Sequence, residues 1–306
     1  MLIDYSLFFN EVELLELRYH VLKDHVDKFV VCEGNKTFSG NSKPFILKNA
    51  IKELQLPEDK FLVIELNIPE DDALEVTEFD KICQYPGDEN DVDSILAITR
   101  DRCTRNALMS VLDQFNDDDC FMINDIDELI DPKYINLALI YANSDPNTIY
   151  KFPLINLYGE ADLRPYFTNG EPLIWRTALS FVKKSQLVKT TPNDIRANYK
   201  VPFNIKNPII NGKIFDEFGW HFSWMGGSER VHLKSVSYGH APNKAHIEQR
   251  NRGFRFKENQ SLTWNENTIM KRVPHEILPK QIFELPRVLK VLLPNYFSDI
   301  NRNGCP

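Results

Sequence analysis

Residues 119–129 read DCFMINDIDEL, and in this stretch an apolar run ends abruptly at two acids spaced two positions apart. In an extended chain successive side chains alternate between faces, so we expect Asp125 and Asp127 to point the same way while Ile126 points into the core. Adjacent carboxylates repel each other unless a cation lies between them, and oxygen ligands of this kind suit magnesium, manganese or calcium. The stretch therefore predicts a strand that delivers two carboxylates to a metal site.

Three metal chemistries begin with such a pair of acids. A calcium-binding EF-hand loop starting at Asp125 would need Gly and Glu where the chain has Ile130 and Asn136, so this class is excluded. A phosphohydrolase with Asp125 as nucleophile is weakened by Leu129, which stands where a hydroxyl or small residue is expected, but it stays open. In a nucleotide-sugar glycosyltransferase, the two acids would hold a divalent ion against the donor diphosphate. A fourth alternative has no function, because the acids would then simply end the strand in solvent. The pair of acids alone does not decide between these alternatives.

Upstream of these acids, strand and helix patterns alternate. The predicted strands cover residues 1–9, 28–33 and 61–66, and the predicted helices cover 12–26, 47–54 and 95–115. Such alternation implies right-handed crossovers and parallel strands whose carboxyl ends form the ligand crevice. The fold class is therefore α/β, with a Rossmann-type, largely parallel central sheet flanked by helices. The chain contains neither G-x-G-x-x-G nor G-x-x-x-x-G-K-[ST], which removes the commonest dinucleotide and ATP sites.

The downstream half is less regular. It predicts a helix at 132–142, a strand at 148–158, a loop-rich segment at 163–216 and helices at 228–238 and 243–257. The strand at 219–224 alternates, which places Trp220, Phe222 and Trp224 on one face and His221 and Ser223 on the other. Three aromatic side chains so close together are usually core, although Trp220 and Trp224 leave a non-catalytic carbohydrate-binding module as an alternative. We expect a catalytic domain at 1–260 and a helical C-terminal extension at 261–306 packed on it.

Composition limits the classes of molecule that the protein can bind and the compartments in which it can lie. A net charge of −8 and a pI near 5.5 argue against a nucleic-acid partner, which needs a basic surface. The five cysteines form no C-x-x-C pair and are expected to be reduced core residues: Cys32, Cys83, Cys103, Cys120 and Cys305. The chain shows no signal peptide and no apolar run near the ~18 residues that span a membrane. We expect a soluble, cytoplasmic protein of unknown oligomeric state.

Three blocks of this sequence resemble glycosyltransferase family 17, the family of the bisecting N-acetylglucosaminyltransferases. The first comprises FNE (9–11), LLELRYH (14–20), VDKFVVCE (26–33) and NKTF (35–38). The second is DDCFMINDIDE (118–128), and the third is GWHFSW (219–224) with Glu229. Three blocks in the right order are far more specific than one pair of acids. The resemblance covers residues 5–240 and does not reach beyond about residue 260.

The resemblance implies a GT-A fold, a UDP-sugar donor, a divalent ion (Mn²⁺ or Mg²⁺) and inversion at the anomeric carbon. The implied donor is UDP-N-acetylglucosamine, with another UDP-hexose as the alternative, and the acceptor is a glycan. The chain differs from the Golgi members in lacking a membrane anchor and in having Leu129 and Ile130 where they usually have Ile-Pro. An unanchored homologue is compatible with a bacterial or viral source and with a different glycan acceptor.

Roles can be assigned on this basis. We expect Asp125 and Asp127 to bind the metal directly or through water, and the shared third block adds His221 on the opposite side of the crevice. Contacts to uridine and diphosphate are expected from residues at strand ends and on the helix before the acids, namely Asn10, Glu11, Glu33, Arg100 and Arg105.

An inverting transfer is a single displacement, so one carboxylate must take the proton of the acceptor hydroxyl. Glu229 is the expected catalytic base because it follows the aromatic strand and a Gly-Gly turn and matches an acid of the third block. Asp162 and Glu160, which follow another strand, are the alternatives. Glu128 is expected to be structural.

Overall fold

The computed structural model describes residues 1–84, 88, 90–176, 179–254, 256–262 and 265–296. Within these residues Cys32, Cys83, Cys103 and Cys120 are free thiols, and Cys32 and Cys120 are buried as expected. Cys83 and Cys103 are only half-buried. Cys305 and the last ten residues of the predicted extension, 297–306, lie outside the described residues. No helix in the described part of the chain has the length and apolar character needed to cross a bilayer.

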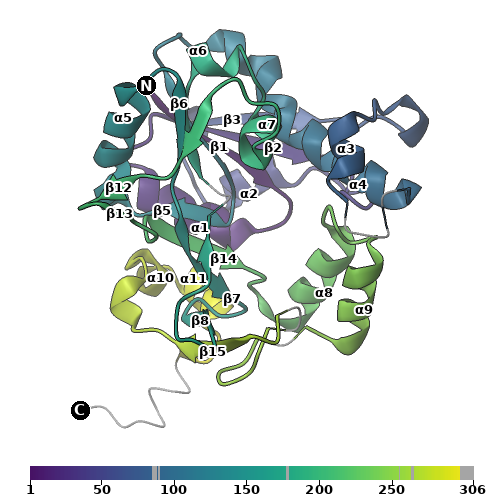
Figure 1. Cartoon of the computed structure of the whole chain (residues 1–306), viewed down its shortest axis with the longest axis vertical. Helices are drawn as coiled ribbons and strands as arrows, with labels where there is room; N and C mark the ends of the chain where they lie inside the picture. Colours follow the sequence, from purple (N-terminus) through teal and green to yellow (C-terminus); the bar gives the residue numbers. More distant parts are fainter. Residues whose placement is uncertain (85–87, 89, 177–178, 255, 263–264, 297–306) are drawn as a thin grey trace.

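A seven-stranded sheet forms the centre of the molecule (Figure 1). Its strands, in order across the sheet, are β11 (Asn204–Lys206), β6 (Thr148–Lys151), β10 (Ser180–Lys183), β4 (Cys120–Asp125), β1 (Leu2–Phe8), β2 (Lys28–Gly34) and β3 (Phe61–Leu66). Strands β4, β1, β2 and β3 are parallel neighbours, whereas β10 runs antiparallel to both β4 and β6. The predicted α/β class with a largely parallel sheet is confirmed.

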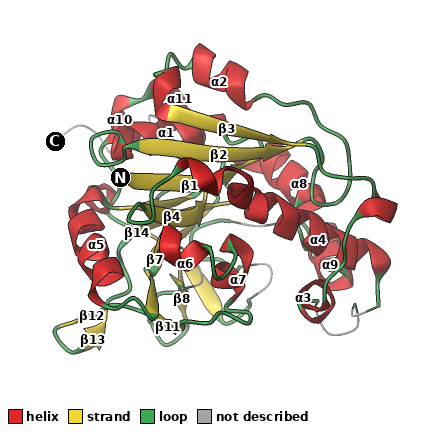
Figure 2. Cartoon of the chain, turned by 90° about the horizontal axis from the view of Figure 1, so that it is seen from above, coloured by secondary structure: helices red, strands yellow, loops and turns green. Residues whose placement is uncertain are grey.

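Helices cover both faces of this sheet, as the view along it shows (Figure 2). Side chains that alternate along β1 enter two different cores, because Leu2 packs with one cluster while Ile3, Tyr5 and Leu7 pack with the other. The first core contains α1 (Val12–Leu22), α2 (Leu47–Glu53), α5 (Ile135–Ser144), α10 (Gln281–Glu284) and α11 (Pro286–Leu292). The second core contains the 3₁₀ helix η3 (Ala107–Gln114), α6 (Lys184–Leu187) and α7 (Pro192–Ala197).

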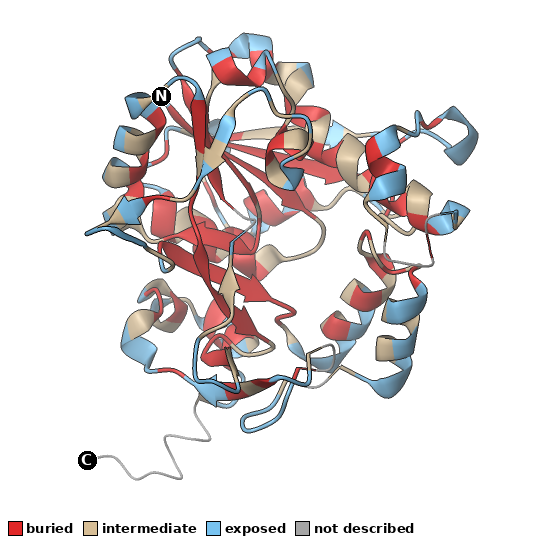
Figure 3. Cartoon of the chain, in the orientation of Figure 1, coloured by how far each residue is buried: buried red, intermediate tan, exposed pale blue. Residues whose placement is uncertain are grey.

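A smaller, four-stranded sheet continues from the first. Its strands are β5 (Glu128–Ile130), β14 (Gly219–Ser223), β7 (Leu154–Tyr158) and β9 (Ile174–Trp175). The hairpin of β12 (Ile209–Ile210) with β13 (Lys213–Ile214) and the pair of β8 (Leu163–Phe167) with β15 (Thr268–Arg272) complete the strands. Strands β1, β2, β4, β5, β7 and β14 are almost wholly buried, whereas the edge strands β3, β9 and β11 are partly exposed (Figure 3).

The remaining helices flank the sheets. They are α3 (Glu78–Ile82), α4 (Val92–Asn106), α8 (Gly227–Ser237), α9 (Lys244–Arg252) and the short 3₁₀ helices η1 (Glu58–Lys60), η2 (Asp71–Ala73), η4 (Pro132–Tyr134) and η5 (His275–Ile277). Figure 1 shows α8 and α9, in green, side by side below α3 and α4. Beyond residue 260 the described chain supplies β15, α10 and α11, and α11 packs in the first core with α1. The division into domains at residue 260 stays a prediction.

Three sequence expectations need correction. The predicted strand 148–158 is broken into β6 and β7, and Pro153, which has no backbone N–H to donate, lies at the break. The predicted helix 95–115 begins earlier and ends at Asn106, after which the chain tightens into η3. Trp224 has a positive φ of 59°, so it leaves β14 and does not share the core face of Trp220 and Phe222.

The strand alternation expected at the two acids is also wrong. Strand β4 ends at Asp125, residues 126 and 127 form a turn, and β5 begins at Glu128. Asp127 is therefore placed by the turn and not by the pleat of a strand. The two acids still reach the same space, because the turn folds Asp127 back toward the edge of the sheet where Asp125 lies.

Candidate active site

A cleft of about 870 Å³ opens at the carboxyl ends of β1, β2 and β4. Ligands of open sheets with parallel strands bind outside these ends, and the volume is typical of small-molecule sites. Further walls come from α4, β14, α8 and α9. The charged and aromatic side chains that line it include Glu11, Asp101, Arg105, Asp125, Asp127, Trp175, Arg196, His221 and Lys234.

Asp125 is held on both of its carboxylate oxygens. Arg105 on α4 approaches Oδ1 at 2.5 Å, and Arg196 on α7 approaches Oδ2 at 2.8 Å. Burial opposes ionisation of Asp125, but the two guanidinium groups outweigh burial and lower the pKa of the carboxyl. Asp125 is therefore a fixed anion at the end of β4.

Asp127 meets two groups that the sequence places far away. The Lys234 Nζ on α8 lies 2.9 Å from Oδ2, and the His221 Nε2 on β14 lies 3.7 Å from the same oxygen. Burial opposes ionisation here too, yet Lys234 and His221 hold the pKa of Asp127 well below its usual range. The fold brings Asp127 and His221 together, but the expected position of His221 on the opposite side of the crevice is wrong, because His221 pairs with Glu128 where β14 runs beside β5. Metal binding by the two residues stays a prediction.

The imidazole of His221 is oriented by its neighbours. Asn156 on β7 donates from Nδ2 to the Tyr158 hydroxyl at 3.2 Å, so its Oδ1 faces His221 Nδ1 at 2.9 Å and accepts a hydrogen bond from the Nδ1–H. The lone pair of the neutral ring, the form that can bind a metal, is then on Nε2, whereas the form that lowers the pKa of Asp127 carries a proton on that nitrogen as well. Trp175 stacks on the ring at 4.4 Å with an angle of 22° between the planes. Histidine ligands of metals are commonly oriented by such a hydrogen bond on the second nitrogen.

Glu128 lies beneath the two acids and is fully buried. It accepts two hydrogen bonds from Arg196 at 2.7 Å each, one from Trp175 Nε1 at 2.6 Å and one from the backbone N–H of Asp125 at 3.0 Å. All of its contacts orient other site residues, which agrees with the structural role expected for it.

A buried lysine supports the same region and yields a prediction. Lys151 Nζ donates to the Arg196 carbonyl at 2.7 Å, and burial, with the nearby Arg196 charge, lowers the pKa of Lys151 to about 8. The unfolded chain therefore binds more protons than the folded chain between about pH 8 and pH 10, so stability rises with pH in that window. Relative to Lys151→Met, the unfolding free energy of the wild type should rise by about 1–3 kcal/mol across it, measured by denaturant titration. A difference that stays flat would contradict this prediction.

The expected donor contacts divide into two groups. Glu11 and Arg105 line the cleft, and Asn10 lines a small cavity beside it. Glu33 is fully buried and accepts from Lys43 and from the N-terminal N–H groups of α2, whereas Arg100 pairs with Asp71 and donates to the Phe38 carbonyl. Glu33 and Arg100 are not among the described residues that line the cleft, but each bonds to a residue that does, Lys43 and Phe38 respectively.

The expected bases also lie apart from the cleft. Glu229 is exposed in the first turn of α8. Asp162 is buried and pairs with Arg272 at 2.6 Å, and Glu160 pairs with the same guanidinium at 3.1 Å. None of the three belongs to the described residues that line the cleft. The base assignment gains no support from this geometry and remains a prediction.

Four site residues were missed from the sequence: Asn156, Trp175, Arg196 and Lys234. Trp175 and Arg196 lie in the segment 163–216, where no periodic pattern could be read. Thr191 followed by Pro192 was the available signal for α7, since Thr191 caps this helix and Pro occupies its first turn. Lys234 lay on a predicted helix, but the pattern did not indicate which face meets the sheet.

The donor atoms present fit a divalent cation. Among the described residues no group of three His, Cys, Asp or Glu side chains converges, but Asp127 and His221 Nε2 do, and a hard ion such as Mg²⁺ is often held by one or two protein ligands with substrate oxygens and water. The described residues around these two also form a network of charged side chains, which we call the cleft ion cluster. Its carboxylates are Glu11, Asp101, Asp125, Asp127 and Glu128, and its cations are Arg105, Arg196 and Lys234. Carboxylates outnumber cations in this network, which favours a bound cation.

The match to a protein family covers the first two sequence blocks. Residues 1–150 match the family described as Glycosyltransferase family 17, which includes Asp125 and Asp127 but not the block of His221. No curated protein sequence matches the chain. One solved structure, 4-diphosphocytidyl-2C-methyl-D-erythritol synthase, aligns over 69% of this chain and 90% of its own with 11% identity and a TM-score of 0.38. The chain belongs to glycosyltransferase family 17, through residues 1–150, and is a glycosyltransferase.

Proposed function

We propose that this glycosyltransferase has a GT-A-type fold and is metal-dependent and inverting, and that it transfers N-acetylglucosamine from UDP-N-acetylglucosamine to a glycan. One observation carries the proposal. In a family 17 chain, Asp127 and His221 Nε2 converge to 3.7 Å within the cleft at the carboxyl edge of the parallel strands. Ligands of open sheets with parallel strands bind at this edge, and we assign the nucleotide-sugar diphosphate to it.

In this proposal Asp127 and His221 hold Mn²⁺ or Mg²⁺, and Asp125 contacts it through water. Once bound, the ion neutralises the charge that develops on the departing diphosphate. Arg105 and Arg196 keep Asp125 ionised and fixed. Asn156 occupies Nδ1 of His221, so the lone pair on Nε2 is available to the ion. The donor's nucleotide is assigned to the part of the cleft near the ends of β1 and β2, where Glu11 lies.

The rival activities fit the geometry less well. A phosphohydrolase needs a carboxylate oxygen of Asp125 free for attack, whereas both oxygens face guanidinium groups. A carbohydrate-binding module would need exposed aromatic faces, but Trp220 and Trp224 are both buried, although Trp224 lines the cleft. Trp220 also donates its Nε1–H to the Ile277 carbonyl. These contacts favour the transferase.

Donor and metal can be identified by thermal shift. A bound ligand stabilises the folded state by mass action, so the matching nucleotide sugar should raise the unfolding temperature only when the matching ion is present. The panel comprises UDP-N-acetylglucosamine, other UDP-hexoses and GDP-mannose, each with Mn²⁺, Mg²⁺ or EDTA. Release of UDP during incubation confirms turnover, whereas hydrolysis of a generic phosphate ester without UDP release would replace the transferase with the phosphohydrolase.

The base is tested by isosteric amides. If Glu229 takes the acceptor proton, Glu229→Gln should nearly abolish transfer while UDP-sugar affinity stays close to that of the wild type, because only proton transfer is lost. Asp162→Asn is the matching variant for the alternative. Initial rates and donor affinities measured side by side separate the two. Normal turnover by both variants would exclude Glu229 and Asp162 as the base.

A further inference from the structure

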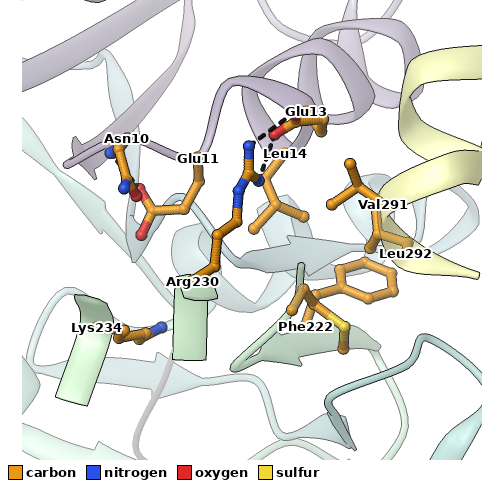
Figure 4. Close-up of a pocket in the computed structure, with 10 residues that line it drawn as sticks. Asn10, Glu11, Glu13, Leu14, Phe222, Arg230, Lys234, Val291 and Leu292 are labelled. Atoms are coloured by element: carbon orange, nitrogen blue, oxygen red, sulfur yellow. Dashed lines mark hydrogen bonds and ion pairs between the residues drawn. The ribbon is translucent and has the colours of Figure 1, made fainter. Parts of the chain in front are cut away.

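Helix α8 carries two cations one turn apart, Arg230 and Lys234, and Figure 4 shows the first of them reaching Glu13 on α1. Arg230 donates two hydrogen bonds to Glu13 on α1, at 2.6 and 2.9 Å, outside the large cleft. Lys234 lines the cleft and donates to Asp127 at 2.9 Å. On the same helix, Arg230 therefore binds α1, and Lys234 belongs to the cleft.

Lys234 is held differently from the other cations of the cleft ion cluster. Arg105 bridges Asp101 and Asp125, and Arg196 bridges Asp125 and Glu128. Lys234, in contrast, contacts one carboxylate among the described residues, and the Trp224 ring lies 5.9 Å away. Its side chain is 30% exposed, against 6% for Arg105 and 16% for Arg196. A flexible ammonium held by a single partner can change partner without disturbing the fold.

Lys234 also lies where a metal ion would create a conflict. Its Nζ and His221 Nε2 both approach Oδ2 of Asp127, at 2.9 and 3.7 Å. A divalent ion bound between Asp127 and His221 would lie a few ångströms from the ammonium, at which distance like charges repel strongly. The ion would therefore compete with Lys234 for the carboxylate of Asp127.

A new partner for the displaced ammonium follows from the chemistry of the donor. The proposed ion binds the diphosphate, so phosphate oxygens come within the reach of a side chain that leaves Asp127. We propose that Lys234 is an exchangeable cation, which covers Asp127 in the ligand-free protein and moves to the diphosphate of the nucleotide when the divalent ion takes its place. This inference rests on the proposed function and adds a residue that binds the leaving group.

The test measures two affinities of Lys234→Met, neither of which requires turnover. Mn²⁺ binding without nucleotide, followed by electron paramagnetic resonance of the free ion, should become about fivefold tighter, because the ion no longer breaks an ion pair. UDP binding at saturating Mn²⁺, followed by calorimetry, should become about tenfold weaker, because a charge-assisted hydrogen bond to phosphate is lost. Lys234→Gln gives the same test if Lys234→Met does not fold.

Arg230→Met is the matched control, since it removes a cation from the same face of α8 without touching Asp127, and both affinities should stay at wild-type values. Mn²⁺ affinity in the Lys234 variants that is unchanged or weaker, or UDP affinity that is unchanged, would overturn the inference. The wild type is measured in the same series. If it binds Mn²⁺ and UDP while the Lys234 variants behave like it, only the role of Lys234 fails. If the wild type binds neither, the proposed function fails and the inference fails with it.

Discussion

Asp127→Asn is expected to weaken Mn²⁺ binding and to lower kcat/KM by about 100-fold or more. The substitution keeps the shape of the side chain but removes the charge that both His221 and Lys234 approach. Metal binding is measured directly by titration, and kcat/KM by UDP release. Unchanged activity with unchanged manganese dependence would refute the metal assignment.

Asp117→Asn is the control for this substitution, because the carboxylate of Asp117 is 81% exposed and lies 3.5 Å from Lys184, away from the cleft. It should bind metal and turn over like the wild type. Thermal unfolding of both variants shows whether a loss of activity reflects a loss of fold. Asp127→Asn that unfolds at the wild-type temperature but fails to bind Mn²⁺ is the result that the proposal requires.

Arg18→Met is expected to lower the free energy of unfolding by about 3–5 kcal/mol, a large part of the ~5–15 kcal/mol typical of a folded domain. Arg18 and Asp4 are almost completely buried and pair through two hydrogen bonds of 2.5 and 2.6 Å. Removing the guanidinium leaves the Asp4 charge buried without its partner. Arg18 also donates to the Glu128 carbonyl at 2.6 Å, so the turn that carries Asp127 loses a support.

Denaturant titration measures this effect against two references. Arg176→Met removes an arginine that is 52% exposed and pairs with Asp216 at 2.9 Å, so it should cost less than about 1 kcal/mol. The double variant Asp4→Leu/Arg18→Met should recover part of the stability lost in Arg18→Met, because no unpaired charge then stays buried. A loss below about 1 kcal/mol in Arg18→Met would show that the pair contributes little.

Local sequence patterns determined the first half of the fold. The apolar runs that became β1, β2, β3 and β4 and the amphipathic segments that became α1 and α2 are long enough to show their period. Because parallel strands deliver their carboxyl ends to one edge, the position of Asp125 followed from the order of elements alone. The length of strand beyond Asp125 did not follow, since the pair of acids reads equally well as a strand or a turn.

Two cationic partners of those acids were decided only by the tertiary structure. Arg196 and Lys234 are separated from Asp127 by at least 69 positions, and each belongs to an element whose orientation depends on packing against the sheet. The exposed position of Glu229 likewise follows from where α8 begins, at Gly227, and from the face that Arg230 and Lys234 turn inward. A sequence shows which residues can carry charge and which segments are helical. Which face of a helix meets a distant strand depends on burial of apolar surface across the whole chain, so this was determined by folding alone.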